Sequence, residues 1–346
     1  MNSQSLDDLT VTRFQKRISE QKIKCTTCRH GCILSDNSFG KCKTRINSKD
    51  NIRSLNYGNI SSMSVNPIEK KPFYHFYPGT FATTVGSSSC NFTCPWCQNY
   101  TITKTFPTKN GIKEILSPEE LYQSILKEPR SSGISFSFNE PTLLADYAID
   151  VLNILKRNNS NLYSNFVTNG YMSLEVLEEL ISAKLSAMVV SIKGGKENMK
   201  KYCNANIDHI FENISIALER KIHIEIVVLV ITEINDSTDF FKFITKKIVE
   251  DYHEDVPIHF NAYYPAYNYH KPRTSVTILE KARSIAMEEG LRFVYIGNIL
   301  GHPALNTYCP SCKEKVITRN QSRFVSNILT KNHCCPTCSE KIPIID

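Results

Sequence analysis

Three cysteines stand close together in the sequence, at Cys90, Cys94 and Cys97, within the segment CNFTCPWC. Three thiolates on one short loop can bind three irons of a [4Fe–4S] cluster, which cysteines normally hold. The fourth iron then stays open to a small-molecule ligand. A structural zinc site needs a fourth protein ligand, and the sequence offers none close by. The spacing therefore predicts a cluster with one accessible iron.

Two further cysteine pairs lie near the end of the chain, with 22 residues between them. The pairs are Cys309 with Cys312 and Cys335 with Cys338. Two CxxC pairs at this spacing are typical of a zinc ribbon, and an iron site of the rubredoxin type is the competing interpretation. The neighbouring Cys334 and His333 would be ligands only if the register differs.

Four more cysteines lie near the N-terminus. They are Cys25, Cys28, Cys32 and Cys42. Four soft ligands this close together should bind a metal, and both zinc and an auxiliary [4Fe–4S] cluster suit them. Free thiols in a basic segment are the alternative. Cys203 stands alone, and we expect it to be an ordinary small residue of the core.

The composition excludes several classes of protein. The chain has 346 residues, of which 41% are hydrophobic and 22% charged, so disorder, collagen and coiled coil are poor interpretations. No apolar run reaches the roughly 18 residues of a membrane span, and the N-terminus lacks a signal-peptide pattern. Thirteen cysteines in such a chain indicate metal or redox chemistry rather than disulfides. We expect a cytoplasmic protein without a membrane partner.

The net charge of +7 is concentrated in the cysteine-bearing ends of the chain. Residues 1–75 carry 13 Lys and Arg against 6 Asp and Glu. Solvated surface, or compensation for thiolate charge at metal sites, is the favoured explanation. Binding of nucleic acid or of an acidic protein is the alternative, and it is not favoured because no dense basic run occurs.

The middle of the chain alternates strand-like and helix-like segments. Strands are predicted at 81–87, 133–138, 162–167, 187–192, 222–231, 257–264 and 293–297. Helices are predicted from 117 onward and at 143–156, 173–183, 208–219, 237–249 and 276–289. Alternation at this spacing indicates a parallel sheet with crossover helices. A partial or complete (βα) barrel fits better than a doubly wound sheet, because no dinucleotide-binding glycine fingerprint follows the first strand.

We therefore expect an α/β chain in three parts. A cysteine-rich N-terminal segment would cover 1–75, the barrel 76–300, and a zinc-ribbon-like segment 301–346. In βα barrels the chemistry lies at the C-terminal ends of the strands. Short motifs follow the predicted strands there: the cysteine triplet, Asn139-Glu140-Pro141, Thr168-Asn169-Gly170, Lys193-Gly194-Gly195 and Asn235-Asp236, with His259 within the sixth strand.

The cysteine loop resembles the signature of the radical S-adenosylmethionine superfamily. The similarity extends to the stretches NPIEKKPFYHFYPGT, SFSFNEPT, VTNGY, HFNAYYPAY and GHPALNTYCPSC. Together they resemble the branch of pyruvate formate-lyase activating enzymes, and most closely the radical enzymes of the AmmeMemoRadiSam system. This resemblance implies a [4Fe–4S] cluster, S-adenosylmethionine as cofactor, and an external electron donor such as flavodoxin or ferredoxin.

The resemblance also implies roles for individual residues. Cys90, Cys94 and Cys97 would hold the cluster, and the amino and carboxylate groups of the cofactor would chelate the open iron. The cofactor would further contact Trp96 beside its adenine, Asn139 and Glu140 at its amino group, Thr168 and Asn169 near its ribose, Lys193 at its carboxylate, and His259 near its ribose or sulfonium. A plain core aromatic for Trp96, a helix cap for Glu140 and a structural role for His259 are the alternatives.

Two positions depart from the activating enzymes. Those enzymes usually carry Asp before Thr-Asn-Gly, where this chain has Val167, and Asp two residues before the lysine, where it has Ser191. The lost carboxylates could change how substrate or cofactor is held, so they weaken a direct transfer of the pyruvate formate-lyase activity.

The resemblance implies an oxidoreductase in which the reduced cluster cleaves S-adenosylmethionine to methionine and a 5′-deoxyadenosyl radical, which abstracts hydrogen from a substrate. The substrate could be a backbone glycine of a partner protein, as in glycyl-radical activation, a small metabolite, or an RNA or protein. The competing class is a zinc-ribbon module that binds nucleic acid or protein.

Overall fold

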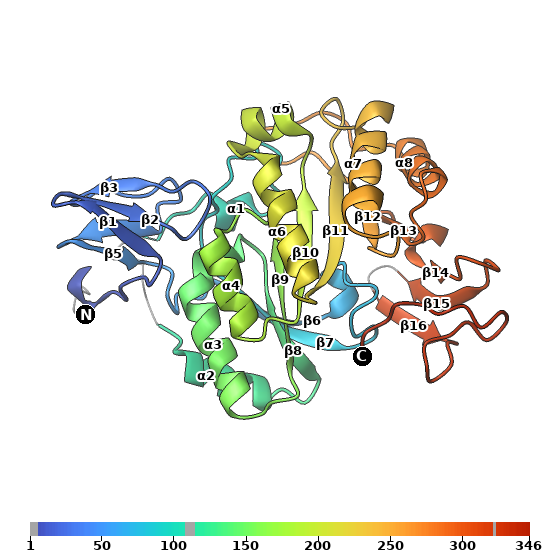
Figure 1. Cartoon of the computed structure of the whole chain (residues 1–346), viewed down its shortest axis with the longest axis horizontal. Helices are drawn as coiled ribbons and strands as arrows, with labels where there is room; N and C mark the ends of the chain where they lie inside the picture. Colours follow the sequence, from blue (N-terminus) through green and yellow to red (C-terminus); the bar gives the residue numbers. More distant parts are fainter. Residues whose placement is uncertain (1–5, 108–114, 321–322) are drawn as a thin grey trace.

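The computed structural model describes residues 6–107, 115–320 and 323–346. Its centre is an eight-stranded sheet in the order β13-β12-β11-β10-β9-β8-β7-β6 (Figure 1). The strands are β6 Ser62–Pro67, β7 Phe81–Gly86, β8 Ser131–Phe136, β9 Tyr163–Thr168, β10 Ala187–Ile192, β11 His223–Val230, β12 Ile258–Ala262 and β13 Val294–Gly297. Only β6 runs antiparallel to its neighbour. The described strands leave β13 and β6 as open edges, so the barrel is partial.

All seven predicted strands are present as β7 to β13, and the predicted fold class is confirmed. Strands β10 and β11 are almost continuously buried, as expected for parallel strands covered on both faces. The largest differences from the sequence-based bounds lie at strand ends. β12 stops at Ala262 because the N–H of Tyr263 donates to Thr274 Oγ1 instead of to a ladder carbonyl. β8 stops at Phe136, two residues before Phe138, whose φ is 70°.

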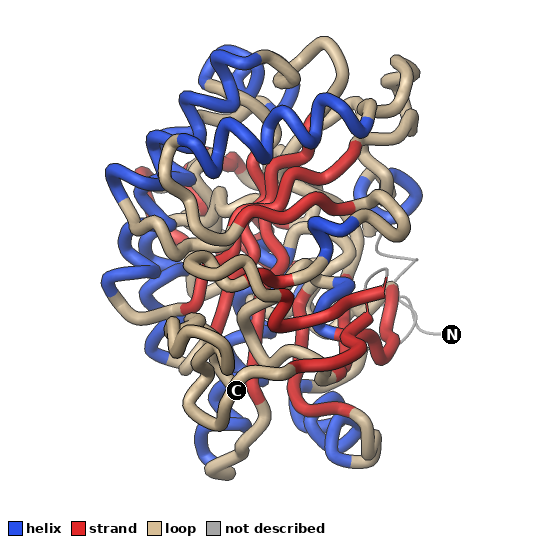
Figure 2. Tube along the Cα trace, turned by 90° about the vertical axis from the view of Figure 1, so that its right-hand side faces the viewer, coloured by secondary structure: helices blue, strands red, loops and turns tan. Residues whose placement is uncertain are grey.

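The helices lie along the outer face of this sheet (Figures 1 and 2). They are α1 Tyr100–Thr103, α2 Pro118–Leu126, α3 Ala145–Arg157, α4 Leu174–Ser182, α5 Lys196–Asn198, α6 Ile207–Glu219, α7 Thr238–Asp251 and α8 Val276–Glu288. The helix predicted from Leu143 begins two residues later, as α3, and a 3₁₀ segment, Pro141–Leu144, precedes it. Four helices start at a serine that accepts a backbone N–H, as sequence capping rules predict. No helix in the described ranges has the length and apolar content needed to cross a membrane.

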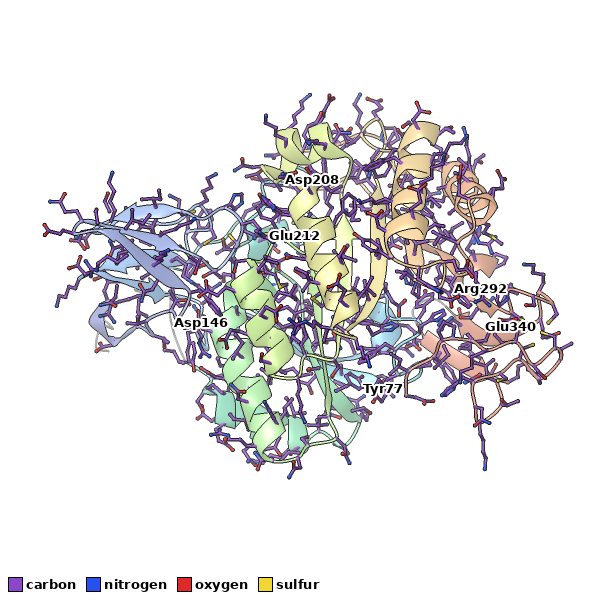
Figure 3. All side chains as sticks on the ribbon, in the orientation of Figure 1. Tyr77, Asp146, Asp208, Glu212, Arg292 and Glu340 are labelled. Carbon is purple, nitrogen blue, oxygen red and sulfur yellow. The ribbon has the colours of Figure 1, made fainter. Side chains whose placement is uncertain are left out.

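The N-terminal residues form two small antiparallel units beside the core. These are the sheet of β1 Gln15–Ser19, β2 Lys22–Cys25 and β3 Ile33–Ser35, and the hairpin of β4 Arg45–Ser48 and β5 Asn51–Ser54. Asp146 of α3 anchors both to the core (Figure 3). Its Oδ2 accepts from Thr12 Oγ1 at 2.7 Å and pairs with the buried Arg45 guanidinium at 3.3 Å. Thr12 and Arg45, through Asp146, therefore hold the two N-terminal units against the barrel.

The C-terminal residues form a third antiparallel sheet at the other side of the core (Figure 1). Its strands are β14 Thr307–Tyr308, β15 Lys315–Asn320 and β16 Arg323–Asn327. The buried Arg319 donates to the Tyr74 carbonyl at 2.7 Å, and its guanidinium carbon lies 4.1 Å from the centre of the Tyr74 ring. Arg292 and Glu340 add an ion pair across the same junction (Figure 3).

Buried His75 links the core to the C-terminal residues and should make the fold acid-sensitive. Its ring nitrogens contact Tyr295 Oη at 2.7 Å and the Pro343 carbonyl at 3.1 Å. Burial lowers the pKa of His75 from its ordinary 6.5 to about 3. Between these values the unfolded chain binds a proton that the folded chain does not, so stability falls as the pH falls below 6.5.

We therefore expect the free energy of unfolding to be lower at pH 5.5 than at pH 7.5 by on the order of 1 kcal/mol from His75. Urea titrations of the metal-loaded protein at the two pH values measure this difference. In the His75→Gln variant the difference should shrink by that amount. An equal difference in both proteins would contradict the assignment.

Candidate active site

The loop that follows β7 carries the three central cysteines, and one side chain holds its first turn. Asn139 donates from Nδ2 to Ser87 Oγ, and its Oδ1 accepts from the Ser87 N–H, at 3.2 and 3.0 Å. The same Nδ2 lies 3.2 Å from the Ser88 carbonyl oxygen and 3.0 Å from that of Ser89. Through these contacts Asn139 positions the cysteine loop from the end of the next strand.

The three cysteines of this loop have different surroundings. Cys94 is buried, whereas Cys90 and Cys97 are half-buried. The Cys94 sulfur lies 3.4 Å from the sulfur of Cys203, the lone cysteine of the sequence, which is buried as expected. A hydrogen bond between the two thiols lowers the pKa of Cys94, burial opposes this shift, and the charge of Lys193 adds to the lowering. Cys94 and Cys203 therefore form one buried pair of thiols.

The surroundings of these sulfurs fit an iron–sulfur cluster and a further ligand. Of all Cys, His, Asp and Glu that the structure describes, only a C-terminal cysteine group brings three or more ligand atoms within 4.8 Å of one another. Sulfurs bound to different irons of a cubane stand wider apart than sulfurs around one zinc. Two buried donors of the loop, Asn91 Nδ2 and Trp96 Nε1, have no hydrogen-bond partner. Unpaired buried donors are uncommon and suit a site that binds another group.

Glu140 is the buried acid at the end of β8. Its Oε1 accepts from Thr142 Oγ1 and Thr168 Oγ1, each at 2.6 Å, and its Oε2 accepts from the Asn169 N–H at 2.7 Å. It also caps the 3₁₀ turn through the Thr142 N–H. Burial raises the pKa of Glu140 despite these bonds. No ion pair among the described residues includes Glu140, so the site offers a buried carboxylate that a bound cation would stabilise.

A chain of amide contacts connects Glu140 with the cysteine loop. Asn169, held through its backbone by Glu140, donates from Nδ2 to Asn91 Oδ1 at 2.8 Å. The same Nδ2 lies 4.0 Å from Cys90 Sγ. Predicted residues from the ends of β7, β8 and β9 therefore meet at one edge of the sheet: Cys90, Asn139, Glu140, Thr168 and Asn169.

Trp96 and Lys193 lie close to this group. Trp96 is buried and its ring lies 5.4 Å from Tyr202 and 5.7 Å from Tyr269, centre to centre. Lys193 follows β10, hydrogen-bonds to Ser191, and is near enough to Cys94 to lower its pKa. Ser191, at the position where the resemblance leads one to expect an aspartate, is thus a hydrogen-bond partner of Lys193. The cofactor contacts of both residues stay predictions.

His259 lies apart from the motifs at the strand ends. It is the second residue of β12, and its Nε2 lies 2.8 Å from Glu225 Oε2. Glu225 is fully buried, which alone would raise its pKa, but hydrogen bonds from His223 and His259 hold the pKa well below its usual range. Its Oε1 also accepts the backbone N–H groups of Tyr74 and His75, each at 2.8 Å. The observed contacts of His259 thus serve a buried carboxylate, and its role near the cofactor stays a prediction.

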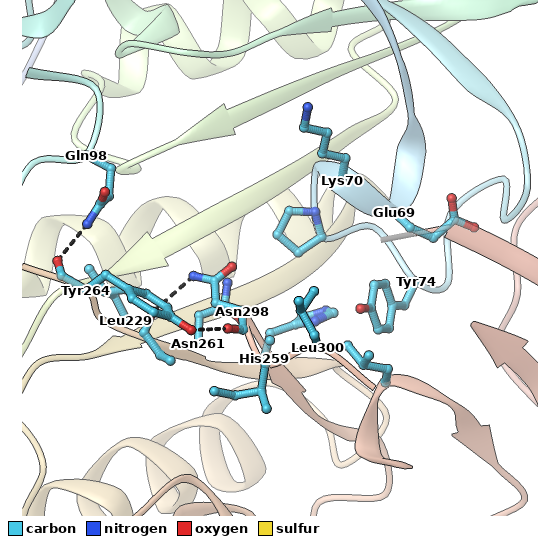
Figure 4. A pocket seen from close by; sticks show the side chains of 15 residues that line it. Glu69, Lys70, Tyr74, Gln98, Leu229, His259, Asn261, Tyr264, Asn298 and Leu300 are labelled. Carbon is cyan, nitrogen blue, oxygen red and sulfur yellow. Dashed lines mark hydrogen bonds between the residues drawn. The ribbon is translucent and has the colours of Figure 1, made fainter. Parts of the chain in front are cut away.

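A pocket of about 550 Å³ lies between the end of the cysteine loop and the region of His259 (Figure 4). Its wall runs from Gln98, the residue after Cys97, to His259. Gln98 donates to the Tyr264 carbonyl at 2.7 Å, and the pocket also exposes Asn261, whose Oδ1 has no hydrogen-bond partner. A cavity of this size with a few polar groups among apolar residues is typical of a small-molecule site. The pocket therefore begins at the residue that follows the last cysteine of the loop.

Sequence reasoning missed three of these residues. Asn91 and Gln98 lie directly beside cysteines of the loop, and Asn261 lies within β12. For Asn91 and Asn261 a polar side chain among apolar residues was the available signal, because a buried amide needs a partner. Gln98 is exposed in a loop and carried no such signal.

The C-terminal cysteines form a compact tetrad. Their four sulfurs all lie within 4.8 Å of one another, with Cys309 and Cys338 at 3.4 Å and Cys312 and Cys335 at 3.6 Å. A tetrahedral zinc with Zn–S bonds of about 2.3 Å separates its sulfurs by about 3.8 Å. Each CxxC pair closes the same turn, with the cysteine N–H donating to a glutamate carbonyl five residues later. The four sulfurs are therefore arranged so that they could hold one metal ion.

His333 and Cys334 lie outside this tetrad. His333 pairs with Asp346 at 3.1 Å, and the Cys334 thiol donates to the Asn332 carbonyl. The register of the ligands is therefore the one expected from the two CxxC pairs.

Replacing Cys309 with Ala should remove one metal ion per chain and destabilise the C-terminal sheet, because structural metal binding is coupled to local folding. Cys334→Ala is the matched control and should keep the metal. Metal content by plasma emission and limited proteolysis measure both effects. Unchanged metal content in Cys309→Ala would exclude the site.

The N-terminal cysteines line one small enclosed cavity at the junction with the barrel. Cys25 and Cys42 are buried, and Cys28 and Cys32 are half-buried. Unlike the C-terminal tetrad, these described cysteines do not gather all their sulfurs within 4.8 Å of one another.

Comparisons with known proteins agree with this geometry. The profile of the Radical SAM superfamily matches residues 84–244, which run from β7 into α7. The uncharacterized protein MJ0808 of Methanocaldococcus jannaschii is 33% identical over 334 residues, covering 96% of this chain and 98% of that protein.

Two solved structures match this chain over different lengths. A radical SAM methyltransferase from Sphaerobacter thermophilus has a TM-score of 0.50 and 13% identity, with 84% of this chain and 78% of that chain covered. A domain of pyruvate-formate lyase-activating enzyme from Bacteroides vulgatus has a TM-score of 0.41 and 17% identity, with 48% and 99% covered.

The chain belongs to the radical S-adenosylmethionine superfamily. Its central parallel sheet is of the radical SAM type, as the sequence predicted, and the cysteine loop lies within the matched residues. The narrower resemblance to the AmmeMemoRadiSam radical enzymes stays a prediction.

Proposed function

We propose that this protein is an enzyme that holds a [4Fe–4S] cluster with Cys90, Cys94 and Cys97 and cleaves S-adenosylmethionine reductively. When bound, the cluster supplies the electron that converts the cofactor to methionine and a 5′-deoxyadenosyl radical. Hydrogen abstraction from a substrate C–H then follows. Membership of the superfamily supports the proposal at the level of reaction type.

One observation carries the proposal: a buried carboxylate that can bind a cation shares one hydrogen-bonded framework with the cysteine loop. Glu140 holds the backbone of Asn169, and Asn169 holds Asn91 next to Cys90. The carboxylate of Glu140 has no cationic partner among the described residues and suits the cofactor's ammonium group. Thr168 and Asn169 would then face the ribose, Trp96 the adenine and Lys193 the cofactor carboxylate.

The pocket beside Gln98 is our candidate for the substrate site. It adjoins the cysteine loop at Gln98, and its volume of about 550 Å³ suits a small metabolite or a single side chain. An activase-like reaction on a glycine of a partner protein requires an extended peptide to reach the same place. We favour a small substrate, because the volume of the pocket is that of a small-molecule site.

Three further assignments complete the proposal. Zinc occupies the tetrad Cys309, Cys312, Cys335 and Cys338, since the sulfur spacing is close to that of a tetrahedral zinc site. A flavodoxin or ferredoxin supplies the electron. The reaction takes place in the cytoplasm, where thirteen unpaired cysteines stay reduced.

The direct experiment is anaerobic reconstitution with iron and sulfide, followed by addition of S-adenosylmethionine and dithionite. We expect a brown protein that forms 5′-deoxyadenosine. A colourless protein that binds only zinc, and binds nucleic acid instead, would overturn the proposal in favour of a zinc-ribbon module.

A further inference from the structure

The N-terminal cysteines form a second enclosed sulfur site. All four line one small cavity together with Gly31, Gly40, Arg45 and Leu143 of the core. They come from three places in the chain: the end of β2, the turn after it, and the loop between β3 and β4. Arg45 is buried and lines the same cavity, and a buried guanidinium suits a site that carries several thiolates.

Hydrogen-bonding groups surround these sulfurs. Thr44 Oγ1 lies 3.2 Å from Cys42 Sγ, where either atom can donate, and the Cys25 thiol donates to Thr27 Oγ1 at 3.4 Å. The Lys41 N–H points at Cys32 Sγ at 3.5 Å. Donors of this kind, directed at cysteine sulfurs, stabilise iron–sulfur clusters and tune their potentials.

The spacing of the sulfurs separates this site from the C-terminal tetrad. The tetrad is contracted to pair distances of 3.4 and 3.6 Å, close to the spacing around one zinc. The N-terminal sulfurs, like those of Cys90, Cys94 and Cys97, are not drawn within 4.8 Å of one another. The N-terminal sulfurs therefore lack the close grouping that the tetrad shows.

The site also touches the cluster loop. Ser89 Oγ donates to the Cys42 carbonyl at 2.6 Å, and His30 Nε2 contacts the Asn91 carbonyl at 2.8 Å. The Asn91 side chain has its Oδ1 3.8 Å from Cys90 Sγ and is near enough to Cys28 to act on that thiol. One residue thus lies between the two sets of cysteines.

We propose that Cys25, Cys28, Cys32 and Cys42 hold a second [4Fe–4S] cluster, beside the one on the Cys90 loop. All four irons of this cluster have a cysteine ligand, so it offers no open iron and binds no S-adenosylmethionine. The inference stands apart from the proposed reaction, because it concerns a different ligand set.

Metal and sulfide content of the full-length protein test this assignment. The anaerobically reconstituted wild type should contain about eight irons and eight sulfides per chain, with about one zinc. The Cys28→Ala/Cys42→Ala variant should lose about half of the iron and sulfide and keep its zinc. Cys94→Ala should lose the other half, whether or not the proposed reaction is correct. Cys334→Ala is the matched control and should lose nothing.

Two results would overturn the inference. One is about two zincs and four irons per chain in the wild type, which would make the N-terminal site a zinc site. The other is a Cys94→Ala protein without iron and sulfide. If the double variant does not fold, the Cys94→Ala protein decides alone, because its EPR spectrum after reduction should still show a [4Fe–4S]⁺ signal that does not change on adding S-adenosylmethionine.

Discussion

Replacing Cys94 with Ala should abolish formation of 5′-deoxyadenosine. Cys94 is the buried member of the three-cysteine loop, and on this account it supplies one of the three bonds from the protein to the cluster. A cubane with only two cysteine ligands on this loop should not assemble there. We expect a loss of at least about a thousandfold in rate, the usual scale for removing an essential group. Anaerobic assays with dithionite and chromatographic detection of the nucleoside measure it.

The matched control is Cys203→Ala, which removes another buried thiol only 3.4 Å from the Cys94 sulfur. This variant should assemble the cluster and keep the reaction. Formation of 5′-deoxyadenosine by Cys94→Ala would contradict the ligand assignment. Loss of the cluster in Cys203→Ala would show that the assignment of Cys90, Cys94 and Cys97 as the cluster ligands is wrong.

Replacing Glu140 with Gln should weaken binding of S-adenosylmethionine about thirtyfold, which corresponds to about 2 kcal/mol for a lost charge-assisted pair. In the wild type both carboxylate oxygens of Glu140 accept hydrogen bonds, from Thr142, Thr168 and Asn169. The glutamine side chain would place an N–H group against one of these donors. Part of the loss of affinity therefore comes from a displaced Asn169. Titration of the cofactor into reconstituted protein gives the dissociation constants.

Thr142→Val separates the charge of Glu140 from its role as a cap. It removes the Thr142 hydroxyl that donates to Glu140 but keeps the carboxylate and the Thr142 N–H. We expect a small loss of stability and an unchanged affinity for S-adenosylmethionine. Equal dissociation constants for wild type and Glu140→Gln would reduce Glu140 to a structural cap.

Local sequence patterns were sufficient for the barrel strands and for the C-terminal metal site. The run AMVVSI at 187–192 became β10 with the predicted bounds, because a short continuous apolar run between polar turns suits a buried parallel strand. The ligands of the C-terminal tetrad lie in two local turns, and the spacing alone defines each turn.

Long-range contacts could not be predicted from local sequence patterns. His259 was placed near the cofactor by resemblance, while in the fold it contacts Glu225 on the neighbouring strand. Glu225 did carry a signal, since a lone acid in the apolar run HIEIVVLV must find a buried partner. The contact between Asn91 and the N-terminal cysteines joins residues about 60 positions apart, and no spacing rule reaches that far.

The central claim is that the cluster on Cys90, Cys94 and Cys97 has an open iron that binds the amino acid end of S-adenosylmethionine. Electron–nuclear double resonance on the reduced protein with cofactor labelled by ¹⁵N at its amino group tests this directly. The account predicts a ¹⁵N hyperfine coupling to the cluster that disappears in Cys94→Ala. A reduced, cluster-loaded wild type that binds the cofactor but shows no ¹⁵N coupling would contradict it.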